Sequence, residues 1–256
     1  MKGSFYLAIL LFLSCNNDAG TNNTVSDPVT KGSSQMKDSL PFAQDSNSQM
    51  KIKSPEGIYQ TTLPCTDCKG LQHTIAFYKD KTFRLEEEKW GGKNSLSKTT
   101  GNWNTTNNVI SLYKDQLVIG QYKWKRDTLA YVQNANEYSL HKLTSASENE
   151  VWKNKKKEGL EFFGVGNEPF WNIEIDEQKF IAFHLSDWEK AVRFKFSKPL
   201  VSADSISYNT SNDAATVQLT IYDQFCSDGM SDFIYSNKVK LVYNGTVYQG
   251  CGIFLK

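Results

Sequence analysis

Two cysteines separated by two residues, Cys65 and Cys68, form the pair in this sequence whose spacing is most specific for chemistry. Paired thiols at this spacing serve as zinc ligands, as redox catalysts, as a disulfide or as a soft two-thiolate site for Cu(I). Zinc is disfavoured, because a structural zinc site needs four ligands and the nearest candidate, His73, falls on the apolar face of a predicted strand. Catalysis of the thioredoxin type is disfavoured too, because the pair precedes a strand pattern and not a helix.

The two remaining uses of the cysteine pair, a disulfide and a Cu(I) site, stay open on the residues alone. Closing so short a loop stabilises the folded state by only about 2 kcal/mol in the chain-entropy model, and any ring strain would make the bond easier to reduce. Two thiolates can also hold Cu(I) in near-linear geometry, and oxidation to the disulfide would abolish that site. The two uses compete for the same sulfur atoms, as a redox or copper sensor requires. The plain alternative is a structural clip.

A second disulfide is expected between Cys226 and Cys251, near the end of the chain. Closing this longer loop should stabilise the fold by about 3–4 kcal/mol in the same model. We therefore expect the Cys226–Cys251 bond to be the structural one and the Cys65–Cys68 bond to be the reducible one.

The fifth cysteine, Cys15, ends a hydrophobic leader that runs from Phe5 to Leu13. This run is too short for a membrane-spanning helix, which needs about 20 residues, and it is typical of a secretory signal. Because Ser14 stands directly before it, Cys15 lies in a pattern that resembles a bacterial lipobox. We predict a lipoprotein signal peptide over residues 1–14 and lipidation by palmitate at Cys15. The alternative is an ordinary signal peptide with a chance cysteine.

The composition bounds the fold and the partners. The net charge is +1, so no strong attraction to nucleic acid is expected. Residues 15–53 are rich in Asn, Ser, Asp, Thr and Lys with scattered apolar residues, which indicates a flexible tether. Short alternating runs of aromatic and β-branched residues then indicate an all-β fold. We predict two small antiparallel β-barrel-like domains, over residues 54–144 and 161–256, with a linker at 145–160.

Three carboxylates of the second domain, Glu168, Asp228 and Asp232, are weak candidates for a cation site or an acid–base pair. The alternative is structural: Asp228 lies in a turn that Asp232 caps, and Glu168 bonds to nearby backbone. The sequence contains no visible nucleophile–base arrangement and no phosphate-binding loop. We therefore expect no enzymatic activity and no required cofactor, with Cu(I) at the cysteine pair as the candidate metal.

Three sequence elements resemble the N-terminal domain of the NlpE family of copper-resistance lipoproteins: GIY at 57–59, LPCTDCKG at 63–70 and GNW at 101–103. The resemblance covers roughly residues 55–143 and implies a lipocalin-like small barrel on an outer-membrane lipid anchor. It places the C-x-x-C of the family at Cys65 and Cys68. It also implies a role in copper tolerance, or in signalling envelope stress to a sensor protein.

The second domain carries EPFW at 168–171, CSDGMSD at 226–232 and GC at 250–251, and it resembles a family of bacterial envelope domains with the same elements. That resemblance implies no activity. We predict an outer-membrane lipoprotein, on the periplasmic side or at the surface, that responds to copper or redox state. Asn16 after the lipid site favours the outer membrane by analogy with a known sorting rule. The alternative is a binding module whose barrel holds a small hydrophobic or lipidic ligand.

Overall fold

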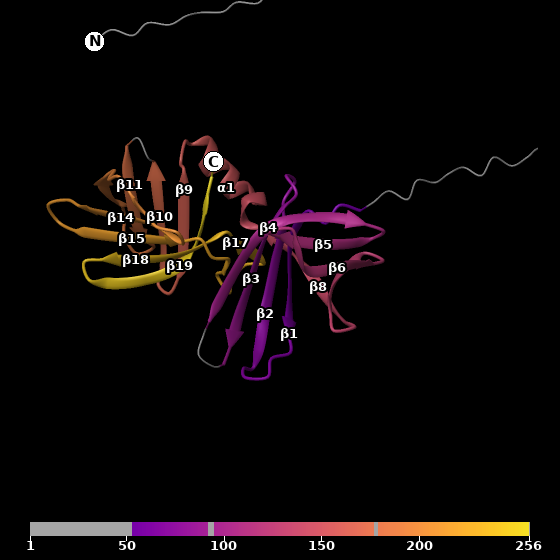
Figure 1. The fold of residues 1–256 in the computed structure, drawn as a ribbon. Helices are drawn as coiled ribbons and strands as arrows, with labels where there is room; N and C mark the ends of the chain where they lie inside the picture. Colours follow the sequence, from indigo (N-terminus) through magenta and orange to yellow (C-terminus); the bar gives the residue numbers. More distant parts are fainter. Residues whose placement is uncertain (1–52, 92–94, 177–178, 256) are drawn as a thin grey trace, which may run out of the picture. The chain divides into compact units, whose positions relative to one another are not determined.

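Two β-sheets and one α-helix make up the described part of the chain, which in this computed structural model covers residues 53–91, 95–176 and 179–255 (Figure 1). The predicted all-β class is therefore confirmed. The predicted signal peptide, the lipidation site Cys15 and nearly all of the predicted tether lie outside the described residues. The described residues belong to one compact unit.

The first sheet contains a closed antiparallel barrel, drawn from indigo to pink in Figure 1. Each barrel strand pairs with the next along the chain, and the first pairs with the eighth at Ile58, Tyr59 and Gln60. The strands are β1 (Gly57–Leu63), β2 (Gly70–Phe77), β3 (Thr82–Trp90), β4 (Leu96–Thr106), β5 (Val109–Lys114), β6 (Leu117–Lys125), β7 (Thr128–Gln133) and β8 (Asn136–Ser145).

Tight two-residue turns join several of these strands. Asn107 and Asn108, between β4 and β5, have φ angles of 50° and 64°. Asn244 and Gly245, which make a turn in the second sheet, have φ angles of 45° and 82°. Positive φ at both central residues gives a hairpin turn whose twist matches that of the paired strands, and Asn and Gly adopt it at low cost.

The barrel interior is filled by its own aromatic and aliphatic side chains. The ring of Phe77 meets the ring of Tyr122 edge-on at 5.4 Å and that of Trp103 at 5.8 Å. Edge-to-face pairs at these spacings add to the stabilisation from apolar burial. The buried cluster comprises Tyr59, Ile75, Phe77, Phe83, Trp103, Ile110, Leu112, Tyr122, Leu129 and Leu140.

The second sheet has nine strands in the order β12-β11-β10-β9-β19-β18-β15-β14-β13, drawn in orange to yellow in Figure 1. Its strands are β9 (Phe162–Asn167), β10 (Phe170–Asp176), β11 (Phe180–Leu185), β12 (Val192–Lys195), β13 (Leu200–Val201), β14 (Ser205–Ser211), β15 (Thr216–Tyr222), β18 (Asn237–Tyr243) and β19 (Thr246–Phe254). One buried face supplies a large core that includes Phe162, Trp171, Phe183, Leu219 and Leu241.

The second sheet curls, but backbone pairing does not close it. Its edge strands are β12 and β13, and side chains of β14 and the turn after it reach across to β12. Thr210 donates to the carbonyl of Lys195 at 2.9 Å, and Asn212 donates to that of Arg193 at 3.1 Å. These bonds occupy backbone acceptors that an open edge would otherwise offer to another strand.

A short helical segment links the two sheets, within the predicted linker. It consists of the 3-10 turn η1 (Ala146–Glu148) and the helix α1 (Glu150–Lys157). Asn149 caps α1 by accepting from the backbone N–H of Val151, and three lysines in the last turn oppose the negative end of the helix dipole. Among the described residues, no helix has the length and apolar character needed to cross a membrane.

A small hairpin from the second half of the chain joins the barrel sheet, and the sequence pattern did not predict it. Its strands are β16 (Cys226–Ser227) and β17 (Phe233–Tyr235), and β17 pairs in parallel with the end of β8.

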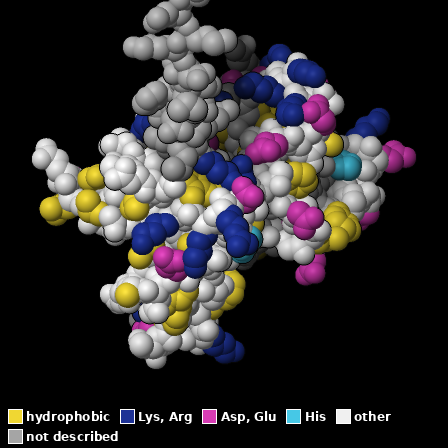
Figure 2. Space-filling view, turned by 90° about the vertical axis from the view of Figure 1, so that its right-hand side faces the viewer, with side chains coloured by type: hydrophobic (Ala, Val, Ile, Leu, Met, Phe, Trp, Pro, Cys, Tyr) yellow, Lys and Arg dark blue, Asp and Glu magenta, His cyan; other side chains and the backbone are white. Residues whose placement is uncertain are grey.

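The face shown in Figure 2 carries Lys and Arg side chains interspersed with Asp and Glu, in keeping with the net charge of +1.

Candidate functional site

The Cys65–Cys68 pair lies in the surface loop between β1 and β2, and the structure joins the two sulfurs in a disulfide. The two Cα atoms are 5.3 Å apart, and both side chains are partly exposed. The backbone N–H of Lys69 donates to the carbonyl of Trp90 at 2.7 Å, which ties the end of the loop to β3. The two cysteines of the loop are therefore accessible to solvent, and the end of the loop is held by its hydrogen bond to β3.

Asp67, inside the loop, brings a carboxylate close to both sulfurs. Its Oδ1 lies 3.3 Å from Cys65 Sγ, and the ligand atoms of Cys65, Asp67 and Cys68 all lie within 4.8 Å of one another. Lys89 on β3 holds the carboxylate with Nζ–Oδ distances of 2.7 and 3.0 Å. The hydrogen bond from Lys89, together with its charge, lowers the pKa of Asp67. The sequence interpretation missed Asp67, although its position between the two cysteines was visible.

His73, the histidine nearest to the pair in sequence, is buried in the barrel. Its Nδ1 lies 2.8 Å from Glu87 Oε1, its Nε2 lies 2.8 Å from the Tyr122 hydroxyl, and the ring of Tyr131 stacks on it at 4.5 Å. Burial raises the pKa of Tyr122 well above its usual value. His73 thus has two polar partners, Glu87 and Tyr122, and it does not lie with the cysteine sulfurs in one cluster of potential ligands.

The second disulfide joins Cys226 on β16 to Cys251 on β19, with Cα atoms 5.5 Å apart. Cys251 is only 1% exposed, whereas Cys226 is partly exposed. The bond ties the β16–β17 hairpin to the second sheet, while β17 itself pairs with the barrel strand β8.

Among the described residues, the three candidate carboxylates of the second domain do not lie together as a cluster of potential metal ligands, whereas Cys65, Asp67 and Cys68 do. Asp228, and not Asp232, caps the turn: its Oδ1 accepts from the backbone N–H groups of Met230 and Ser231 at 3.0 and 2.8 Å. Asp232 is exposed, and so is Glu168. In this structure the carboxylate of Asp228 accepts hydrogen bonds from the turn, and the cation site at Glu168, Asp228 and Asp232 stays a prediction.

The Asp228 carboxylate also accepts from the Tyr235 hydroxyl at 2.8 Å. Burial alone would raise the pKa of Asp228, but the hydrogen bonds from Ser231, Tyr235 and Met230 lower it. Burial, more than the bond to Asp228, raises the pKa of Tyr235 to about 12. Asp228 therefore acts as an ionised cap for the loop between β16 and β17.

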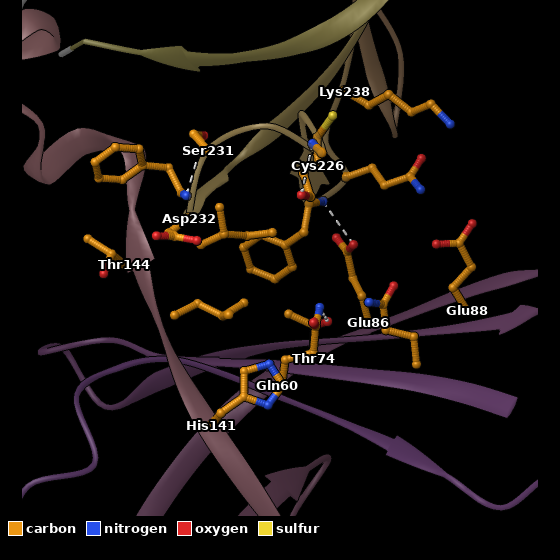
Figure 3. A pocket seen from close by; sticks show the side chains of 18 of the residues that line it. Gln60, Thr74, Glu86, Glu88, His141, Thr144, Cys226, Ser231, Asp232 and Lys238 are labelled. Atoms are coloured by element: carbon orange, nitrogen blue, oxygen red, sulfur yellow. Dashed lines mark hydrogen bonds between the residues drawn. The ribbon is translucent and has the colours of Figure 1, made fainter.

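A pocket of about 840 Å³ lies outside the barrel, between its wall and the β16–β17 hairpin. Glu86 at its floor is buried, accepts from the side chain of Arg84, and accepts from the backbone N–H of Phe225 at 2.9 Å. Arg84 also pairs with Asp223 at 2.7 Å. Figure 3 shows the barrel side with Gln60, Thr74, Glu86, Glu88 and His141, and the opposite side with Cys226, Ser231, Asp232 and Lys238.

Comparisons with known proteins find a family model and solved structures that are similar to parts of the chain. No curated protein matches the chain. Two crystal structures are similar to parts of it. A candidate lipoprotein from Shewanella oneidensis is 26% identical over 34% of this chain and 87% of its own, with a TM-score of 0.29. The Cpx pathway activator NlpE from Escherichia coli is 16% identical over 75% of this chain and 94% of its own, with a TM-score of 0.28. The family model described as the NlpE N-terminal domain matches residues 59–160.

Proposed function

We propose that this chain is a non-enzymatic envelope lipoprotein whose Cys65–Cys68 loop responds to redox state or to Cu(I). The observation that carries the proposal is the loop itself: two cysteines at the surface of an NlpE N-terminal domain, close enough for their sulfurs to bond. A sensor needs sulfur atoms that a reductant, an oxidant or a metal ion can reach. The partly exposed Cys65 and Cys68 meet that need, whereas the buried Cys251 does not.

The donor chemistry of the loop fits Cu(I). Two thiolates are soft ligands, and Cu(I) accepts them in near-linear coordination without a third donor. The disulfide form has no thiolate to offer, so oxidation and Cu(I) binding exclude each other. In the proposal, a dithiol reductant opens the Cys65–Cys68 bond by thiol–disulfide exchange and is itself oxidised to a disulfide. Two electrons and two protons pass to Cys65 and Cys68, which become thiols.

The proposal is tested by Cu(I) titration of the reduced full-length protein against a coloured Cu(I) chelator. The parent should compete with the chelator, and the double variant Cys65→Ser, Cys68→Ser should not. The double variant Cys226→Ser, Cys251→Ser is the matched control and should retain Cu(I) binding. Equal Cu(I) affinity in the parent and in the Cys65→Ser, Cys68→Ser variant would remove the metal version of the proposal.

Localisation and partner belong to the same proposal. A diacylated Cys15 would anchor the protein firmly, because two acyl chains hold far better than one. We place it at the outer membrane, on the periplasmic side or at the surface, with an envelope sensor protein as the partner. Membrane fractionation of a Cys15→Ala variant should move the protein to the soluble fraction, and retention in the membrane would contradict the anchor.

A second candidate function, a module that binds a small hydrophobic or lipidic ligand, is favoured by one observation. The barrel interior is packed with its own rings, but the pocket of about 840 Å³ outside the barrel wall is open, and Phe225 and Ile234 lie in its mostly polar lining. Native mass spectrometry of the delipidated protein would show a retained small molecule. If none is retained, this candidate is dropped.

A further inference from the structure

The disulfide loop contains a third potential metal ligand beside its two sulfurs. Cys65 Sγ and Asp67 Oδ1 lie 3.3 Å apart, and all three ligand atoms of the loop lie within 4.8 Å of one another. In a tetrahedral zinc site, with Zn–S about 2.3 Å and Zn–O about 2.1 Å, a sulfur and an oxygen ligand lie about 3.6 Å apart. In the oxidised loop, where the two sulfurs are bonded to each other, the carboxylate already lies near the distance from Cys65 Sγ that a shared tetrahedral ion would need; reduction must separate the sulfurs before an ion can bind.

The third donor, a carboxylate, adds more to the binding of a divalent cation than to the binding of Cu(I). Two sulfurs already satisfy Cu(I), and a hard carboxylate adds little to it. Zn²⁺ is of borderline softness, accepts both thiolate and carboxylate ligands, and occurs in sites with three protein ligands and a water. We propose that Asp67 is a third ligand of the reduced loop, and that it raises the affinity of the site for a divalent thiophilic cation such as Zn²⁺ while leaving the Cu(I) affinity almost unchanged. This inference rests on the proposed function of the loop as a metal-responsive site.

Lys89 controls how available the carboxylate is. It contacts both oxygens of Asp67, at 3.0 and 2.7 Å, so a bound cation must compete with the ammonium group. The ion pair is open to solvent, with side-chain exposures of 38% for Lys89 and 65% for Asp67. An exposed pair of this kind is weak, so a dication can displace the lysine. In the proposal, Lys89 lowers the affinity of the site for a dication but does not prevent the dication from binding.

Loading of the site begins with reduction of the disulfide. A dithiol reductant supplies two electrons and two protons to Cys65–Cys68 and leaves as its own disulfide. The cation then replaces the two thiol protons, which pass to water. Reoxidation of the loop by a disulfide or quinone oxidant removes both thiolates, and the single remaining carboxylate is too weak to retain the ion. The cation would therefore be held only in the reduced state.

The experiment measures Zn²⁺ and Cu(I) affinities of the reduced, detergent-solubilised full-length protein by competition with chromophoric chelators. Asp67→Asn should weaken Zn²⁺ binding by about tenfold or more, while the Cu(I) affinity changes by less than about twofold. Lys89→Met should tighten Zn²⁺ binding by about two- to fivefold, the size expected for an exposed ion pair. Asp127→Asn is the matched control, because Asp127 is also an exposed carboxylate paired with a lysine, Lys53 at 2.8 Å.

The outcomes separate this inference from the proposed function. Unchanged Zn²⁺ affinity in Asp67→Asn, or an equal loss of Zn²⁺ and Cu(I) affinity, overturns the role of Asp67 and leaves a two-thiolate site. Unchanged affinity for both metals in Cys65→Ser, Cys68→Ser overturns the metal site as a whole. A selective loss of Zn²⁺ affinity in Asp67→Asn, absent in Asp127→Asn, supports the inference.

Discussion

Replacing Glu86 by glutamine should weaken the attachment of the β16–β17 segment to the barrel. The Glu86 and Arg84 side chains are only 5% and 8% exposed. Glu86 Oε1 accepts from Arg84, and Oε2 accepts from the backbone N–H of Phe225 at 2.9 Å. A glutamine has one oxygen, so one of the two donors would face an NH₂ group instead of an acceptor.

The expected cost follows from these contacts. Breaking a buried ion pair by removing one partner costs about 3–5 kcal/mol. Arg84 keeps a second partner, since it lies 2.7 Å from Asp223, and the amide oxygen still accepts one bond. We therefore expect Glu86→Gln to lower the free energy of unfolding by about 2–3 kcal/mol.

The assay is urea unfolding at neutral pH, followed by tryptophan fluorescence. Glu88→Gln is the matched control, because Glu88 lies two positions along the same strand, lines the same pocket and is only partly buried. That control should stay within about 0.5 kcal/mol of the parent. Equal stability of the two variants would refute the reasoning, because it would mean that Glu86 carries no more of the structure than an accessible carboxylate does.

Three further predictions concern other titratable or polar contacts. Lys89→Met should raise the pKa of Asp67 toward its usual value, since the hydrogen bond and charge of Lys89 lower it; carboxyl NMR titration measures this, and an unmoved pKa contradicts it. His73→Phe should cost about 2–4 kcal/mol in thermal unfolding, because it leaves the buried Tyr122 hydroxyl without its partner, whereas His141→Phe at an exposed position should cost little. Burial would raise the pKa of Asp228, but its hydrogen bonds lower that pKa. Asp228 therefore contributes to the free energy of unfolding above its unfolded-state pKa of about 3.9, and this contribution is lost as the pH falls through its lower folded-state pKa. Tyr235→Phe should reduce that loss of stability as the pH falls below about 4. Urea unfolding at several pH values measures this, and an unchanged dependence of the unfolding free energy on pH would argue against it.

The sequence predicted those strands and turns whose residues carry a local pattern, such as an alternation of apolar and polar residues or a turn-forming pair. The β2–β3 hairpin follows from the alternation after Leu71 and the polar turn at 79–81, and the Asn107–Asn108 turn follows from its residues. The β16–β17 hairpin was missed, because strands of two and three residues carry no readable period. Its pairing with β8 joins positions about ninety residues apart, and no local pattern reports such a contact.

The sequence predicted the two cysteines of the site, but it did not predict which side chains lie around them. The spacing of Cys65 and Cys68 pointed to a shared loop, but the ion pair of Asp67 with Lys89 depends on the register of β2 against β3. The structural alternative predicted from the sequence made Asp232 the cap of the turn, whereas in the structure Asp228 is the cap. The turn takes the first aspartate as its cap because the N–H groups of the next residues converge on its carboxylate.

The most direct test of the sensing proposal is the redox state of both cysteine pairs in intact cells, with and without added copper. Rapid acid quenching, alkylation and mass spectrometry of the peptides would give the thiol fraction of each pair. The proposal predicts that the thiol fraction of Cys65 and Cys68 changes with copper or oxidant, while Cys226 and Cys251 stay bonded throughout. A Cys65–Cys68 pair that stays fully bonded under every condition, including strong reductant, would contradict it.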